Sequence, residues 1–444
     1  MRDYSEQHRE QEAADLRAAT LAIAQRSTNL EKGDPDWQAR LIYSGGKNPV
    51  AKAILANAAT YFRYCPDWHG VLAYDEFALR VVPVKGLPWG MPKGNRWTDQ
   101  DDRLATERLQ HNGIFVSVET AGLAVQTVAM ESGFHPVRQY LEGLKWDGFP
   151  RLHSWLTTYA GAPDTPYFSA VGARWMIAAI ARIFRPGCKA DCMLILEAVQ
   201  GALKSTLFKT LGGQWFTDEV ADLGTKDSAM QFAGVWIIEF AELDSMGRSE
   251  TGKTKAVVSR TTDRFRPPYG KQVLEAPRQC VFAGTVNHAN YLKDETGGRR
   301  FWPVACGRID IDAVTRDRDQ LWAEALVEYR AGAKWWLDTE ELNRDAAVHQ
   351  EERYEGDVWD ALIAKWIENP EPRSDTSGHA IQPFTSTDES ITVTDVLIHA
   401  IGKRPEQWVQ PDANRVARAL KSMHWERYKK RVGGTFAWHY RREA

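Results

Sequence analysis

One segment constrains this chain more than any other, LEAVQGALKST at Leu196–Thr206. It follows a short apolar run, Met193–Leu196, and precedes a segment with helical character, Leu207–Leu211. Strand, tight loop, Lys-Ser-Thr and helix is the order of a phosphate-binding loop. In such a loop, backbone N–H groups surround the phosphates, a lysine contacts the β and γ oxygens, and a hydroxyl group holds Mg²⁺.

Lys204 and Ser205 fit the last two of these roles. The predicted nucleotide contacts are Gln200, Gly201, Ala202, Leu203, Lys204, Ser205 and Thr206. The match is imperfect, because the pattern G-x-x-x-x-G-K-[ST] has glycine where this chain has Ala198 and Leu203. If the Leu203 backbone needs a positive φ, a side chain there costs about 1–2 kcal/mol. We therefore expect weakened but retained nucleotide affinity.

Length and composition set the broad class. A chain of 444 residues predicts two to four domains. Its 43% hydrophobic and 26% charged content is that of a soluble globular protein. Five scattered cysteines without a C-x-x-C pair indicate reduced thiols. The sequence predicts neither a bilayer-spanning segment nor a signal peptide, so we expect the cytoplasm of a bacterial host cell. A net charge of −3 means that nucleic-acid binding must depend on local patches.

A second apolar run, Val235–Ile238, predicts a buried parallel strand. Carboxylates appear as it ends, at Glu239, Glu242 and Asp244. In a phosphate-loop enzyme the next core strand carries one acid that holds Mg²⁺ and another that polarises the attacking water. A separation of about 30 residues from the loop is that of βαβ units. Glu239 is the predicted metal ligand together with Ser205.

A third apolar run, Cys280–Val286, ends at Asn287. A polar side chain at the tip of a core strand contacts the γ-phosphate or its attacking water. Ordinary helix capping by Asn287 is the alternative interpretation.

Two arginines follow a Gly-Gly pair in TGGRRFWPV, Thr296–Val304. They lie on a predicted loop before a strand. An arginine supplied across a subunit interface stabilises charge on a transferring phosphoryl group. Arg299 and Arg300 are the candidates, and a structural salt bridge is the alternative.

Basic and aromatic residues are interleaved in Lys253–Gln279, which the Pro-Pro and Gly residues favour as a loop. The members are Lys253, Lys255, Arg260, Arg264, Phe265, Arg266, Tyr269, Lys271 and Arg278. Such a composition suits phosphate contact and base stacking on a DNA strand. A solvated loop face is the alternative.

In the C-terminal part, the spacing of apolar residues predicts two helices, Thr392–Ile401 and Asp412–Met423. A β-hairpin, Trp425–Val432 and Thr435–Tyr440, follows around Gly433-Gly434. Two helices followed by a hairpin is a winged-helix signature. From Pro411 onward there are nine basic and three acidic residues, a net charge of +6. This patch favours duplex DNA, with Arg415, Arg418, Lys429 and Lys430 as candidate contacts, and a docking module is the alternative.

The predicted domains are therefore a helical arm (1–40), an α+β domain (41–155), a phosphate-loop core (156–345), a helix with a linker (346–388) and a winged-helix-like domain (389–444). The order of motifs resembles the virulence-associated protein E family of phage and genomic-island proteins, which are AAA+-type ATPases related to superfamily 3 helicases. The resemblance covers about His135–Trp336, and Val71–Trp155 less closely. It rests on FHPVRQYLEGLKWDG, PGCKADCMLILEAVQGALKST, GVWIIEFAEL, DRFRPPYG, FAGTVN and TGGRRFWPV.

The resemblance implies an α/β fold with a P-loop AAA+, superfamily 3-like helicase core, an N-terminal α+β region and a C-terminal winged helix. It implies a homo-oligomeric ring, a hexamer, with ATP and Mg²⁺ at subunit interfaces and single-stranded DNA in the central channel. The implied site residues are Lys204 and Ser205 for the nucleotide, Glu239 and Glu242 for Mg²⁺ and water activation, Asn287 as sensor, and Arg299 or Arg300 as arginine finger. The expected function is an ATP-dependent DNA helicase or replication-initiation ATPase. The alternatives are a DNA-binding oligomer with a degenerate, hydrolysis-deficient site and a replication-interference protein.

Overall fold

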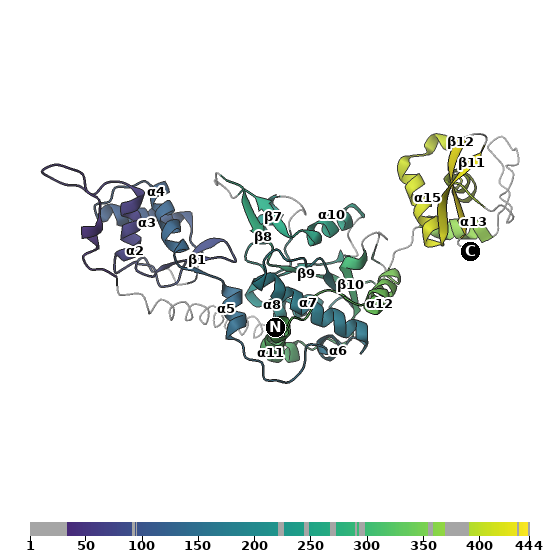
Figure 1. The fold of residues 1–444 in the computed structure, drawn as a ribbon, viewed down its shortest axis with the longest axis horizontal. Coiled ribbons are helices and arrows are strands. Elements are labelled where there is room, and N and C mark those ends of the chain that lie inside the picture. The colour runs from purple at the N-terminus through teal and green to yellow at the C-terminus, as the bar shows by residue number, and fades with distance from the viewer. Residues whose placement is uncertain are drawn as a thin grey trace. The chain divides into compact units, whose positions relative to one another are not determined.

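The computed structural model describes residues 33–90, 94, 96–220, 226–243, 248–266, 272–288, 291–292, 298–353, 358–368, 390–432 and 435–442. The chain forms two compact units, residues 1–354 and 355–444, and each is described by itself (Figure 1). The predicted helical arm up to residue 32, the linker over 369–388, and Asp244, Tyr269 and Lys271 lie outside the described residues.

The N-terminal region of the first unit is an α+β fold, as the sequence predicts. Its elements are η1 (Trp37–Arg40), α2 (Leu55–Tyr64), β1 (Leu72–Asp75), β2 (Arg80–Pro83), α3 (Asp99–His111), α4 (Val118–Met130) and β3 (Gly133–Phe134). The sheet order is β2-β1-β3, with β2 antiparallel and β3 parallel to β1. The Asp101 carboxylate accepts from the N–H of Thr98 at 2.8 Å and so caps α3. Trp68 is buried at the centre of the core of this region.

The core of the first unit is a five-stranded parallel sheet. Its strands are β4 (Met193–Glu197), β5 (Phe216–Thr217), β6 (Ile237–Phe240), β9 (Val281–Val286) and β10 (Phe301–Ala305). The order is β10-β4-β9-β6-β5, and every pairing is parallel. All residues of β4, β6 and β9 are buried, because helices cover both faces of a parallel sheet. The three predicted apolar runs are confirmed as its central strands.

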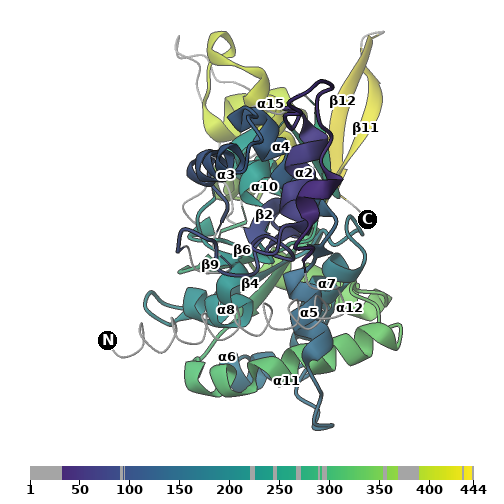
Figure 2. The same cartoon turned by 90° about the vertical axis from the view of Figure 1, so that its left-hand side faces the viewer.

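Alternate residues of β4 face the two sides of this sheet. Leu194 and Leu196 belong to the core that contains α7, α8 and α11, whereas Met193 and Ile195 pack with Val257 of α10. Figures 1 and 2 show the sheet between these layers. The helices of the unit are α5 (Pro136–Gly143), α6 (Trp155–Ala160), α7 (Pro166–Phe184), α8 (Lys204–Gly212), η2 (Gly213–Trp215), α9 (Lys226–Gln231), α10 (Arg248–Ser259), η4 (Gly298–Arg300), α11 (Ile311–Arg330) and α12 (Glu340–Glu351).

Helix α7 is long and apolar enough to cross a membrane by length and composition. However, 78% of its apolar window is buried inside the protein, which is the pattern of a core helix. Its Trp175 side chain donates to the carbonyl of Phe282 in β9 at 2.8 Å and so fixes α7 against the sheet.

The predicted loop over Lys253–Gln279 is wrong in its local structure. Helix α10 continues to Ser259, and a two-stranded antiparallel hairpin follows, β7 (Thr262–Phe265) and β8 (Leu274–Pro277). The hairpin could not be predicted from local patterns, because the ion pair that stabilises it joins residues 15 positions apart. Arg278 forms a buried ion pair with Asp263, at 2.6 Å and 2.8 Å, which joins the base of the hairpin.

The second unit contains α13 (Val358–Glu368), α14 (Val393–Asp395), the π-helical turn η5 (Val396–Ile401), η6 (Pro405–Gln407), α15 (Gln410–Ser422), β11 (Trp425–Val432) and β12 (Thr435–Arg442). The predicted hairpin is confirmed, with β11 antiparallel to β12. The sequence assigned Val358–Glu368 to the region before the domain boundary. The structure instead packs Ile363 and Trp366 into the same core as Val416 and Leu420. The boundary therefore precedes α13, since its apolar face has its partners in the second unit.

Candidate active site

The predicted strand–loop–helix order is confirmed at the segment between β4 and α8. Gly201 has φ +82° and Leu203 has φ 65° and ψ 22°, both in the left-handed region. Leu203 is the N-cap of α8, and its side chain is 50% exposed. Leu203 therefore does need a positive φ, the condition under which a side chain at this position is costly, because its backbone adopts the conformation that favours glycine.

We expect Leu203→Gly to stabilise the first unit by about 0.5–1 kcal/mol. Relief of the left-handed strain contributes about 1–2 kcal/mol, and the greater freedom of glycine in the unfolded chain offsets about 0.4–1 kcal/mol of that gain. Urea unfolding measures the difference. Leu203→Ala is the matched control, because it also truncates the exposed side chain but keeps the Cβ atom. Equal stabilisation by both variants would show that the backbone strain is not the cause.

The side chain of Lys204 connects the loop with the tip of β9. Its Nζ donates to the carbonyls of Ala198 at 2.7 Å and Val199 at 3.0 Å, and to Oδ1 of Asn287 at 3.1 Å. The two predicted residues meet because β4 and β9 are parallel neighbours, so their carboxyl ends lie at the same sheet edge. Lys204 is buried and Asn287 is partly buried.

A carboxylate and two hydroxyl groups meet beside this lysine. Oε1 of Glu239 accepts from Ser205 Oγ at 2.6 Å and from Thr285 Oγ1 at 2.8 Å. Glu239 is fully buried, and its Oε2 has no hydrogen-bond partner among the described residues. Burial raises the pKa of Glu239, and the two hydroxyl bonds oppose that rise. Thr285 was not predicted, although a threonine near the end of an apolar run is the kind of signal that identified Asn287.

The oxygen atoms of Glu239 and Ser205 are suitable ligands for a magnesium ion. Mg²⁺ prefers oxygen ligands, and proteins supply one or two of them while substrate phosphates and water supply the rest. The unpartnered Oε2 of Glu239 and the Ser205 hydroxyl match that requirement. In the described part of the chain, no group of three or more His, Cys, Asp or Glu side chains is placed to hold a metal by itself.

The other predicted catalytic residues are Glu242, Arg299 and Arg300. Glu242 follows β6 by two residues, is exposed, and has φ 52°. Arg299 and Arg300 precede β10, whose first residue pairs with Met193, the first residue of β4. They therefore lie at the opposite sheet edge from the loop, about 13 Å away along β4. Arg300 donates to Ser259 Oγ at 2.6 Å, and Arg299 is exposed.

A buried charge pair that the sequence did not predict, Glu197 with Arg353, directly precedes the loop. Glu197 accepts from Arg353 Nε at 2.9 Å and Nη2 at 2.9 Å, and from Tyr291 Oη at 2.9 Å. The carbonyl of Arg353 also accepts from the N–H groups of Tyr291 and Leu292. No local pattern links these residues, because Glu197 and Arg353 are 156 positions apart.

The predicted DNA contacts differ in accessibility. The predicted DNA contact by Lys255 is wrong, because this side chain is buried on α10. Its Nζ lies 5.7 Å from the centre of the Phe301 ring. Arg260 and Arg266 are exposed. In the second unit, Lys429 and Lys430 are exposed on β11, Arg418 is partly buried, and the Arg415 guanidinium lies 4.0 Å from the centre of the Trp359 ring.

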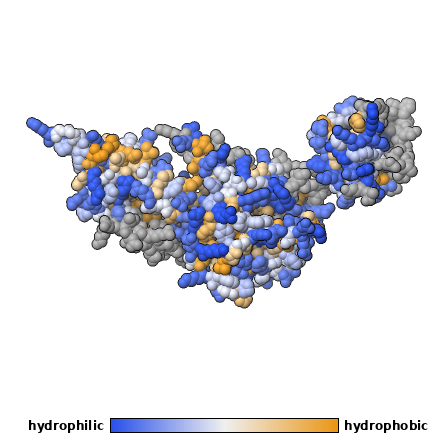
Figure 3. Space-filling view, viewed as in Figure 1, coloured by the Kyte–Doolittle hydropathy of each residue, from blue (hydrophilic) through white to orange (hydrophobic). Residues whose placement is uncertain are grey.

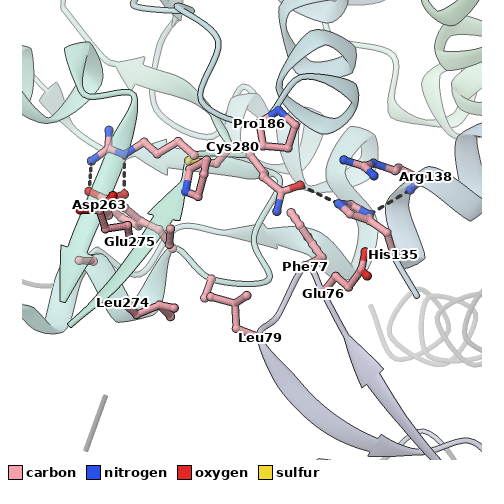
Figure 4. A pocket seen from close by; sticks show the side chains of 17 residues that line it. Glu76, Phe77, Leu79, His135, Arg138, Pro186, Asp263, Leu274, Glu275 and Cys280 are labelled. Atoms are coloured by element: carbon pink, nitrogen blue, oxygen red, sulfur yellow. Dashed lines mark hydrogen bonds and ion pairs between the residues drawn. The ribbon is translucent and has the colours of Figure 1, made fainter. Parts of the chain in front are cut away.

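A cavity of about 290 Å³ separates the β1–β2 turn from the hairpin base (Figure 4). His135 lies at its wall. Its Nδ1 accepts from the N–H of Arg138 at 3.2 Å, so its Nε2 carries the proton and donates to Oε1 of Gln279 at 2.7 Å. Burial lowers the pKa of His135 to about 4, and the bond to Gln279 opposes that shift. His135 thus caps α5 and contacts the chain beside β9 in its neutral form.

Stability is expected to fall between pH 7 and pH 5 because of His135. Its folded pKa of about 4 lies below the ordinary 6.5, so its contribution is complete above pH 6.5 and is lost as the pH falls toward 4. The loss at pH 5 is about 2 kcal/mol. His135→Gln keeps one acceptor and one donor but does not ionise. Comparing urea unfolding of both proteins at the two pH values removes the carboxylate contribution that they share. The same pH dependence in both would exclude His135 as its source.

Comparisons with known proteins agree with the resemblance seen in the sequence. A profile of the virulence-associated protein E-like domain matches residues 141–355. The search of curated proteins found no match. A solved structure titled as the apo NrS-1 C-terminal region (305–718) has 10% identity and a TM-score of 0.45, covering 83% of this chain and 95% of that one. Another structure of that region has 11% identity and a TM-score of 0.43, covering 84% and 96%.

The matched segment contains every strand of the parallel sheet, the loop with Lys204, the carboxylate of Glu239 and the Glu197–Arg353 pair. Residues 141–355 therefore form a virulence-associated protein E-like domain.

Proposed function

We propose that this protein is an ATP-dependent DNA helicase or replication-initiation ATPase of a phage or mobile element, acting in the cytoplasm of a bacterial host cell. The observation that carries the proposal is the meeting of Lys204, Asn287 and the Ser205–Glu239 pair at one edge of a parallel sheet. Charged and polar groups meet there at the carboxyl ends of strands whose residues are all buried. Ligands of open α/β sheets bind at this carboxyl edge.

Each residue has a distinct task in the proposed chemistry. The N–H groups of residues 200–206 at the start of α8 bind phosphate oxygens. Lys204 leaves the carbonyls of Ala198 and Val199 and contacts the phosphates. Ser205 and Glu239 would hold Mg²⁺, which would supply positive charge to balance the phosphates. Glu242 and Asn287 orient and polarise the attacking water. The left-handed backbone conformation of Leu203 strains the loop, and we propose that the loop still binds nucleotide despite this strain.

The arginines support an oligomeric enzyme. Arg299 and Arg300 lie at the sheet edge opposite the loop of their own chain, so they reach a nucleotide only on a neighbouring subunit. A ring, which we propose to be a hexamer, repeats that contact at every interface. Mixing Lys204→Ala with the double variant Arg299→Ala/Arg300→Ala is then expected to restore turnover, because some interfaces combine an intact loop with intact arginines. A mixture as inactive as its components would contradict action across the interface.

DNA is the proposed partner of both units. In the first, the exposed Arg260 and Arg266 flank strand β7 of the hairpin and suit a DNA strand in the ring channel. In the second, α15 and the hairpin β11–β12 form the proposed winged helix, which contacts duplex DNA through its basic residues. Removal of residues 355–444 should lower duplex affinity at fixed salt, and an unchanged affinity would sink that assignment.

DNA-stimulated ATP turnover tests the proposal as a whole. The purified protein with Mg²⁺ and DNA is expected to exceed its Lys204→Ala variant, which keeps the fold but lacks the phosphate contact. Unfolding curves of both proteins check that the fold is intact. Turnover equal to that of the variant would overturn the helicase proposal and favour a DNA-binding oligomer with an inactive site.

A further inference from the structure

One face of the hairpin β11–β12 carries exposed aromatic rings among its basic residues, which phosphate contact with a duplex does not require. We propose that one face of this hairpin binds unpaired nucleotides, with bases stacked on Phe436 and Trp438 and phosphates held by Arg427, Lys429 and Arg431. We call it the stacking face. The inference rests on the proposed function only in taking DNA as the polymer. It needs neither ATP turnover nor a ring.

The strand register defines the stacking face. Across the hairpin, Lys429 pairs with Trp438 and Arg431 pairs with Phe436. Directly opposite residues of an antiparallel pair lie on the same face, and so do residues two apart on one strand. Arg427 and its partner Tyr440 therefore share this face.

Burial changes along this face. At its base, Trp425 is 7% and Tyr440 is 4% exposed, and both belong to the core of the second unit. Farther along, Phe436 is 69% and Trp438 is 46% exposed. The surface of the second unit seen in Figure 3 is largely hydrophilic. Two large aromatic rings in such a surface, outside the core, indicate a binding site more than a packing role.

Positive charge surrounds the two rings. The Arg427 guanidinium lies 3.9 Å and the Lys429 ammonium 5.1 Å from the centre of the Trp438 ring. The Arg431 guanidinium lies 5.9 Å from the Phe436 ring centre. The two strands contain one acidic residue, Glu426, and it lies on the opposite face, paired with Arg441 at 3.1 Å. The stacking face therefore complements a polyanion with no acidic side chain to repel it.

The spacing of the rings distinguishes an opened strand from a duplex. Phe436 and Trp438 are two positions apart on one strand, about 7 Å. Nucleotides stacked in a duplex follow each other at about 3.4 Å. Two rings at twice that interval match bases whose mutual stacking has been opened. Inside a duplex the base faces are covered by their neighbours, so the rings reach them only at an unpaired strand or a junction.

Binding of the full-length protein to an oligothymidylate strand and to a duplex of equal length, at one salt concentration and without ATP, tests this inference. The double variant Phe436→Ala/Trp438→Ala is expected to lose at least about 30-fold in single-strand affinity, because stacking contributes about 1–3 kcal/mol per base and the variant removes two rings. Its duplex affinity should change less than twofold. Trp438→Phe keeps a ring and should retain most of the single-strand affinity.

Lys430→Ala is the matched charge control, since Lys430 lies on the opposite face of the same strand. It should weaken both polymers by a similar small factor, as a sequence-independent phosphate contact does. Equal losses on both polymers in the aromatic double variant, or no loss on the single strand, would overturn the stacking face. Because the assay omits ATP, its result is separate from that of the turnover test. An inactive ATP site leaves the expected single-strand binding unchanged.

Discussion

Glu239→Gln is expected to reduce DNA-stimulated ATP turnover at least about 100-fold, the contribution of a positioned acid or metal ligand. Gln keeps the size of the side chain and an oxygen that accepts from Ser205 and Thr285. It removes the negative charge that would hold Mg²⁺. Turnover at saturating Mg²⁺ and ATP measures the effect, with Glu219→Gln, an exposed acid, as the control.

The same substitution should stabilise the protein in the absence of nucleotide and Mg²⁺ at pH 7. The folded pKa of Glu239 is raised by burial, so its favourable contribution is complete below the ordinary carboxyl pKa and is lost as the pH rises through the folded value. Ionisation of Glu239 therefore leaves a buried carboxylate whose Oε2 has no partner among the described residues. Gln has no such charge. Urea unfolding should show the gain at pH 7 and its decline toward pH 4.

Loss of activity together with a gain in stability is the signature of a residue kept for function. Retained turnover with lower stability would instead make Glu239 a structural residue. The pair of measurements thus separates the proposed metal ligand from an ordinary buried acid.

Arg353→Met is expected to destabilise the first unit by about 3–5 kcal/mol, because it leaves the Glu197 carboxylate buried without its charged partner. Arg353 supplies three of the hydrogen bonds that the Glu197 carboxylate accepts, two from Nε and one from Nη2, and Tyr291 supplies a fourth. Burial, with the negative charge of Glu197 as the next cause, raises the pKa of Tyr291 well above its ordinary value, so Tyr291 remains a neutral donor. Urea unfolding, followed by near-ultraviolet signals, measures the loss.

The double variant Glu197→Gln/Arg353→Met is the control. It removes both charges and should recover most of the stability, since replacing a whole buried pair is often close to neutral. Arg353→Lys should not recover it, because an ammonium cannot form the paired Nε and Nη2 bonds. If the double variant is as unstable as Arg353→Met, the guanidinium acts through packing and not through the charge pair.

Local patterns in the sequence determined much of the site. Buried parallel strands read as short apolar runs, and a polar residue that ends such a run lies at the sheet edge where ligands bind. For that reason Lys204, Ser205, Glu239 and Asn287 could be brought together from their spacing. The terminal hairpin could be predicted from the Gly433-Gly434 turn between Trp425–Val432 and Thr435–Tyr440.

Tertiary structure alone decided the rest, because the deciding contacts join residues far apart in the sequence. Strand pairing placed Arg299 and Arg300 at the edge opposite the loop. The Arg278–Asp263 ion pair joins the base of a hairpin in a segment that the sequence predicts to be a loop. The sequence could state that a side chain at Leu203 is costly if its φ is positive, but only the path between β4 and α8 shows that it is.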